Sequence, residues 1–96
     1  MSYKLLISPQ VWAHQARLGL QHRRAVKQAI RNLADERGDI LALRDKLAGF
    51  HRLRIGRYRL IFRYGPNRTL QCIYLNDRSL VYEIFEAEMR RILGEG

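Results

Sequence analysis

The pattern that most constrains the fold is a run of alternating arginines that begins after Phe50. In residues 50–55 ("FHRLRI") two arginines alternate with Leu53 and Ile55, and in 58–64 ("YRLIFRY") Arg59, Ile61 and Arg63 alternate with larger apolar side chains. A period of two predicts β-strands, because successive side chains point to opposite faces of a sheet. Gly56-Arg57 between the runs predicts a tight antiparallel turn. We therefore expect a hairpin with arginines along one face.

The N-terminal half predicts a strand followed by two helices. "YKLLIS" is a short apolar run suited to a strand, and Ser8-Pro9 is a typical helix start, with serine as cap and proline in the first turn. We expect helices over residues 9–18 and 21–37, the second ended by Gly38. Apolar residues recur on the second helix at helical spacing: Val26, Ala29, Ile30, Leu33 and Ala34.

The remaining segments complete an α+β fold. Residues 39–49, "DILALRDKLAG", are compatible with a half-turn of helix or an irregular connection. "GPNR" at 65–68 predicts a turn and 69–77 a further strand, while 78–93 is expected to start extended and finish as a helix. We expect residues 1–96 to form a single domain. Its N-terminal strand and helical hairpin would pack on an antiparallel sheet of about four strands, with a short C-terminal helix.

The charge of the chain points to a polyanionic partner. The formal net charge is +9, and 15 of the 18 basic residues are arginine, whose planar fork suits bidentate contact with phosphate or carboxylate. The central third contains no Asp or Glu between Gly49 and Asn76 but six arginines, at positions 52, 54, 57, 59, 63 and 68. A nucleic acid or an acidic protein is the expected partner.

Other classes of function have little support in the sequence. No apolar run approaches the roughly 20 residues that span a bilayer, so a cytoplasmic location without membrane contact is expected. The three histidines are scattered and no acidic cluster has ligand spacing, so no metal or other cofactor is predicted. Cys72 lies in an apolar strand-like run and is interpreted as a buried core thiol.

Two stretches resemble the RelE/ParE toxin superfamily, the toxins of bacterial type II toxin–antitoxin systems. "DKLAGFHRLRIGRYRLIF" is similar to the family's Lys-Leu-x-Gly, Arg-x-Arg strand, glycine turn and Tyr-Arg strand. "LNDRSLVYEIF" is similar to its later segment, in which a tyrosine follows an arginine. The resemblance spans essentially the whole chain and implies the RelE-like fold.

The resemblance leaves three functions open. RelE-like members cut messenger RNA in the ribosomal A site, ParE-like members poison DNA gyrase, and a degenerate member would only bind an antitoxin or RNA. The resemblance implies that the cleavage positions are filled, which favours the first function. They are Arg52, Arg54, Arg59, Arg78 and Tyr82. Basic residues nearby, expected to contact RNA, are Lys46, Arg57 and Arg63.

Metal-independent RNA cleavage uses the ribose 2′-OH as nucleophile and sets the expected roles. Arg59, with Arg52 or Arg54, would hold the phosphate and stabilise the transition state, provided the strand register puts all three on one face. Tyr82 is the candidate general base, because surrounding cations favour its phenolate. Arg78 would assist the leaving group, by its charge if not by proton transfer, since an arginine proton is hard to remove.

His51 is a second candidate for proton transfer, although strand alternation aims it away from Arg52 and Arg54. Structural interpretations of the same residues stay open. Strand arginines can protect an edge from aggregation, and Tyr82 can be a packing residue. Asp77 could pair with Arg78 or cap the following turn.

The resemblance also implies partners. An acidic, partly disordered antitoxin would fold across the arginine surface and the helical hairpin, giving a toxin–antitoxin hetero-oligomer. The ribosome and messenger RNA would be the targets, with ribosomal RNA contacts on the basic surface.

Overall fold

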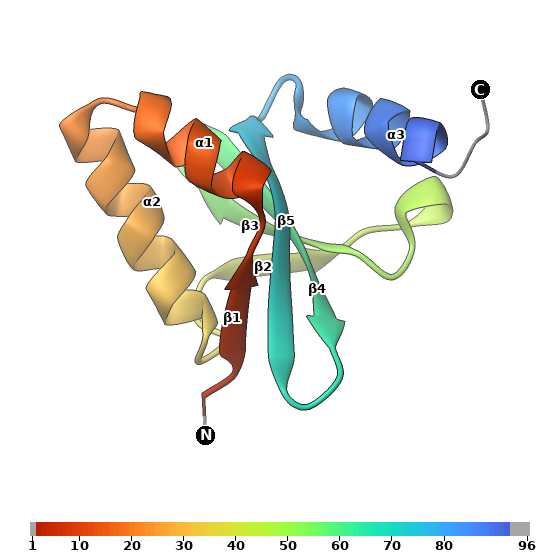
Figure 1. The fold of residues 1–96 in the computed structure, drawn as a ribbon, viewed down its shortest axis with the longest axis horizontal. Coiled ribbons are helices and arrows are strands. Elements are labelled where there is room, and N and C mark those ends of the chain that lie inside the picture. The colour runs from red at the N-terminus through yellow and green to blue at the C-terminus, as the bar shows by residue number, and fades with distance from the viewer. Residues whose placement is uncertain (1, 93–96) are drawn as a thin grey trace.

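The structure is a computed structural model that describes residues 2–92. Five strands form one sheet in the order β1-β5-β4-β3-β2 (Figure 1). They are β1 (Lys4–Ile7), β2 (Asp39–Ala42), β3 (His51–Ile55), β4 (Tyr58–Gly65) and β5 (Thr69–Asp77). The β3–β4 hairpin is antiparallel and turns at Gly56 and Arg57, as the alternation predicts. The α+β class is confirmed.

The sheet differs in detail from an antiparallel sheet of about four strands. The N-terminal strand β1 joins the sheet as an edge and runs parallel to β5, with Leu5 opposite Leu70. The other edge is β2, in the segment that left two interpretations open. Three of its four residues are exposed, so it lacks the alternation of burial that marks a strand in sequence. A short 3₁₀ helix, η1 (Asp45–Leu47), follows it.

Two helices, α1 (Pro9–Arg17) and α2 (Leu20–Leu33), cover one face of the sheet (Figure 1). Ser8 caps α1 by accepting a hydrogen bond from the backbone N–H of Val11, as expected for a Ser-Pro start. The second helix ends at Leu33, four residues before the predicted end. The chain reverses there toward β2 through Glu36 and Gly38, both with positive φ.

The third helix, α3 (Val81–Ile92), lies on the other side of the sheet near the end of β5 (Figure 1). The segment before it is a turn over residues 78–80, where an extended start was expected. None of the helices in residues 2–92 is long and apolar enough to cross a membrane.

The two faces of the sheet have separate apolar clusters. The larger cluster joins α1 and α2 to the strands and includes Val11, Leu33, Leu53, Leu60 and Phe62. The smaller cluster lies under α3 and η1, and its buried members are Leu47, Ile61, Val81 and Phe85. Arg52, Arg54 and Arg59 share their face with the smaller cluster, because Arg52 lies opposite Ile61 and Arg54 opposite Arg59.

Candidate functional site

The strand register places three arginines on one face of the sheet. Arg54 on β3 lies directly opposite Arg59 on β4, and Arg52 lies opposite Ile61. Directly opposed residues of an antiparallel pair point to the same side, and Ile61 belongs to the cluster under α3. The predicted phosphate-binding group requires all three arginines to lie on one face, and the strand register meets this requirement.

Arg52 is held by a residue from the neighbouring edge strand. Its Nη1 donates a hydrogen bond of 2.8 Å to the backbone carbonyl of Asp39 and lies 3.1 Å from that residue's Oδ1. The Arg52 side chain is only 15% exposed. Arg54 is 55% exposed, and its Nη1 lies 3.9 Å from Asp39 Oδ2, at the limit of an ion pair. The arginines of β3 thus have a carboxylate partner from β2, although their own stretch of sequence contains no acidic residue.

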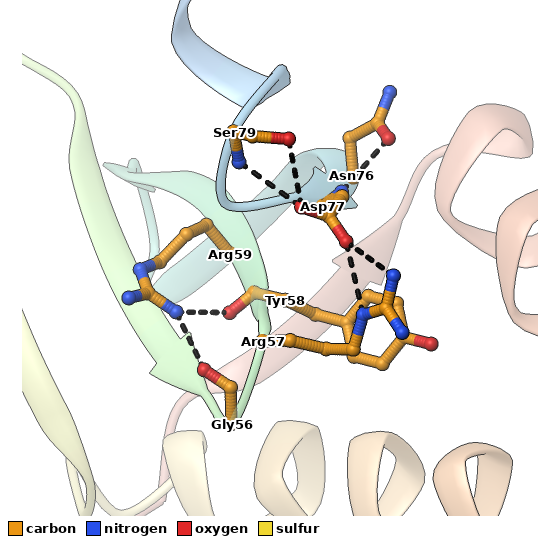
Figure 2. Close-up of polar contacts among 7 residues, drawn as sticks. All are labelled: Gly56, Arg57, Tyr58, Arg59, Asn76, Asp77 and Ser79. Atoms are coloured by element: carbon orange, nitrogen blue, oxygen red, sulfur yellow. Dashed lines mark hydrogen bonds and ion pairs between the residues drawn. The ribbon is translucent and has the colours of Figure 1, made fainter.

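Arg59 is anchored to the backbone of the hairpin turn. Figure 2 shows its Nη1 donating to the carbonyl oxygens of Gly56 and Tyr58, each at 2.8 Å. These bonds fix the guanidinium beside the strand. Both acceptors are neutral, and Arg59 forms no ion pair within residues 2–92, so its positive charge is not compensated there.

Arg57 takes a different direction from Arg59. Its Nε and Nη2 donate to Oδ2 of Asp77 at 3.0 and 2.9 Å, and its guanidinium lies 5.6 Å from the centre of the Tyr58 ring. Figure 2 shows the two side chains on opposite sides of the strand. Arg57, expected to contact RNA, is therefore engaged with Asp77 and separated from the other arginines.

Asp77 also caps the turn before α3. Its Oδ1 accepts from the backbone N–H and the hydroxyl of Ser79, at 3.1 and 3.0 Å (Figure 2). The Ser79 backbone bond, followed by the Arg57 bond, lowers the pKa of Asp77 to about 2, and the same ion pair raises the pKa of Arg57. The predicted turn cap is present, and the arginine that Asp77 pairs with is Arg57.

Arg78 and Tyr82 lie around the start of α3. The side chain of Arg78 is exposed, and its backbone N–H donates to the carbonyl of Arg57 at 2.8 Å. Tyr82 is half-buried in the first turn of α3 and packs against the cluster that contains Ile61. The helix thus brings Tyr82 to the face of the sheet that carries Arg52, Arg54 and Arg59.

The two other predicted RNA contacts have partners within the chain. Arg63 Nε donates to Gln71 Oε1 at 2.5 Å, with its guanidinium 5.8 Å from the centre of the Phe50 ring. Lys46 Nζ lies 3.4 Å from Glu86 Oε1, and its side chain is largely exposed. Arg63 thus connects β4 with β5, and Lys46 connects η1 with α3.

His51 and Cys72 lie away from this face. The His51 ring stacks on Phe62, with the centres 5.5 Å apart, and so belongs to the side covered by α1 and α2. Burial raises the pKa of the Cys72 thiol to about 12, which makes it unreactive at neutral pH. Within residues 2–92 no group of three or more His, Cys, Asp or Glu side chains could hold a metal ion.

Asp39 is the site residue that sequence reasoning missed. It lies thirteen positions before Arg52, the first arginine of the hairpin, in a segment without strand periodicity. Only the pairing of β2 with β3 brings it opposite Arg54. An assignment of residues 39–42 as an edge strand beside β3 would have predicted the contact.

The fold is that of RelE-like toxin structures. The chain is similar to the RelBE2 toxin–antitoxin complex of Mycobacterium tuberculosis (TM-score 0.72, 24% identity, covering 81% of this chain and 100% of that one). It is also similar to the RelE–RelB complex of Pyrococcus horikoshii (0.67, 24%, 81% and 97%) and to a mutant of the free E. coli toxin RelE (0.61, 19%, 94% and 98%). No family model and no curated protein matches the sequence.

Proposed function

We propose that this protein is the toxin of a type II toxin–antitoxin pair and cuts messenger RNA on the ribosome without a metal ion. One observation carries the proposal: in a RelE-like fold, Arg52, Arg54 and Arg59 share the face of the sheet onto which α3 brings Tyr82. Three guanidinium groups with one carboxylate among them form a site for a phosphodiester.

The roles follow from the reaction. Cleavage requires removal of the 2′-OH proton, stabilisation of the charge on the phosphorane oxygens and protonation of the departing 5′ oxygen. Arg59 is held by two carbonyls through Nη1, which leaves its Nε and Nη2 N–H groups for the phosphate. Tyr82 takes the 2′ proton, and Arg78 stabilises the leaving group by its charge.

An acidic antitoxin is the proposed partner, with the cytoplasm as the place of action. The net charge of +9 calls for a polyanion, and the M. tuberculosis and P. horikoshii structures are toxin–antitoxin complexes. Messenger RNA and ribosomal RNA would meet the same basic surface when the antitoxin is absent.

Primer extension on message from translating ribosomes tests the proposal. We expect Arg59→Ala to slow cleavage about 10²- to 10³-fold, because a preorganised charge is lost, and Tyr82→Phe about 10²- to 10⁴-fold, because the base is lost. Arg23→Ala, on an exposed position of α2, removes the same charge elsewhere and should cleave normally. Undiminished cleavage in both site variants would contradict the proposal.

A second candidate is a member of the fold that binds RNA or antitoxin without cleavage. The observation that favours it is that Asp39 and two backbone carbonyls already engage Arg52 and Arg59. Induction in cells separates the functions: cleavage arrests protein synthesis at once, and a non-cleaving member leaves growth unaffected. A gyrase poison, the remaining alternative, would cause DNA damage and filamentous growth.

A further inference from the structure

Asp39 contacts two of the three arginines assigned to the phosphate. It begins β2 and lies directly opposite Arg54, so its side chain is on the arginine face. Its Oδ1 lies 3.1 Å from Nη1 of Arg52 and its Oδ2 lies 3.9 Å from Nη1 of Arg54. Its backbone carbonyl accepts a bond of 2.8 Å from the same Arg52 atom.

We propose that Asp39 is a positioning residue that orients Arg52 for the scissile phosphate and, by its charge, limits the affinity of the site for RNA. The inference rests on the proposed function. The Asp39 carboxylate would thus speed cleavage and weaken the binding of RNA.

The orienting effect follows from how Arg52 is held. Both of its contacts with Asp39 converge on Nη1, and its side chain is largely covered. Ordering a free arginine costs side-chain entropy, and here the order exists before a substrate arrives. Among the residues that the structure describes, Nη1 is the atom of this guanidinium that makes hydrogen bonds. This leaves Nε and Nη2 as the donors for a phosphate, on a guanidinium whose orientation the Nη1 contacts fix.

The effect on affinity follows from charge. A phosphate bound by Arg52 and Arg54 comes close to the Asp39 carboxylate, and the two like charges repel. The Asp39 side chain is 54% exposed, so solvent reaches this pair. At a separation of about 6 Å and an effective dielectric constant of about 40 to 80, the repulsion corresponds to about a threefold to tenfold loss of affinity. Arg54 is held weakly, with 3.9 Å between the charged atoms, and is free to turn to the phosphate.

The test is Asp39→Asn, which keeps the shape and the backbone carbonyl but removes the charge. We expect about threefold to tenfold tighter binding of a short single-stranded RNA, measured by fluorescence anisotropy, with a steeper dependence on salt. We also expect about tenfold slower single-turnover cleavage of ribosome-bound message at saturation, because Arg52 is less firmly oriented. A residue with a purely structural role would not give this opposite pair of changes.

The matched control is Asp45→Asn in η1. It makes the same change of charge at a carboxylate that forms no ion pair among the described residues, and its φ of +56° suits asparagine. Binding and cleavage should stay within twofold of the wild type. If Asp39→Asn does not fold, Asp39→Glu takes its place: it keeps the charge but displaces it, so we expect unchanged RNA affinity with slower cleavage.

The outcomes separate this inference from the proposed function. If the wild type cleaves message but Asp39→Asn binds RNA no more tightly, the assignment of Asp39 is wrong and the proposed function stands. If the wild type neither binds nor cleaves RNA, both are wrong. Tighter binding together with slower cleavage in the Asp39 variant supports both.

Discussion

One carboxylate, Asp77, joins three segments at the end of the sheet. It ends β5, caps the turn at Ser79 and pairs with Arg57 in the hairpin turn. The backbone of Arg57 in turn accepts the N–H of Arg78. Arg57 therefore joins the hairpin turn to the segment that leads into α3, and in the proposed site it would act by holding the start of that helix.

Acid should weaken this junction in a defined range of pH. The folded-state pKa of Asp77 is about 2, below the ordinary value of 3.8, so its contribution to stability is complete above about pH 4 and is lost as the pH falls toward 2. We expect Asp77→Asn to lower the thermal unfolding midpoint at pH 6 and to show a smaller further decrease between pH 5 and 2 than the wild type. Asp45→Asn is the control. Parallel decreases in the wild type and Asp77→Asn would contradict this role.

The elements differ in how far the sequence could predict them. The β3–β4 hairpin was predictable because its signal is local: alternation and a glycine turn lie within one stretch. The arginines on its face were predictable for the same reason. Strand β2 and the contact of Asp39 with Arg52 were not predictable. Both depend on the pairing of β2 with β3, two strands that η1 separates in the sequence. The parallel pairing of β1 with β5 is likewise non-local.

The entry to β2 depends on a glycine that no other residue can replace easily. Gly38 has a φ of +130°, and a Cβ at this position would lie 2.6 Å from Cδ1 of the buried Leu53. We expect Gly38→Ala to lower the free energy of unfolding by about 1–3 kcal/mol, from backbone strain and overpacking, as measured by urea denaturation. Gly19→Ala is the control: it has open space and a negative φ, so it should cost only about 0.5 kcal/mol. Equal losses in the two variants would contradict the close contact with Leu53.

The two clusters give the molecule an uneven stability. The cluster under α1 and α2 contains residues of β3, β4 and β5 as well as both helices, so it holds most of the chain together. Among the residues that the structure describes, the cluster on the arginine face has four buried members, of which α3 contributes Val81 and Phe85. The helix that carries Tyr82 is therefore attached through a small contact, whereas the strands that carry the arginines belong to the main body.

Amide hydrogen exchange can separate these two parts. Phe85→Ala removes the largest of the described buried side chains in the small cluster. We therefore expect faster exchange in α3 alone, with cleavage reduced because Tyr82 is no longer held. Leu33→Ala leaves a cavity in the large cluster and should cost about 2–5 kcal/mol. It should speed exchange in β4 and β5 as well, because these strands share that cluster. If Phe85→Ala accelerated exchange in β4 and β5 as much as Leu33→Ala does, α3 would be part of one cooperative unit with the sheet. Its attachment would then have no separate effect on cleavage.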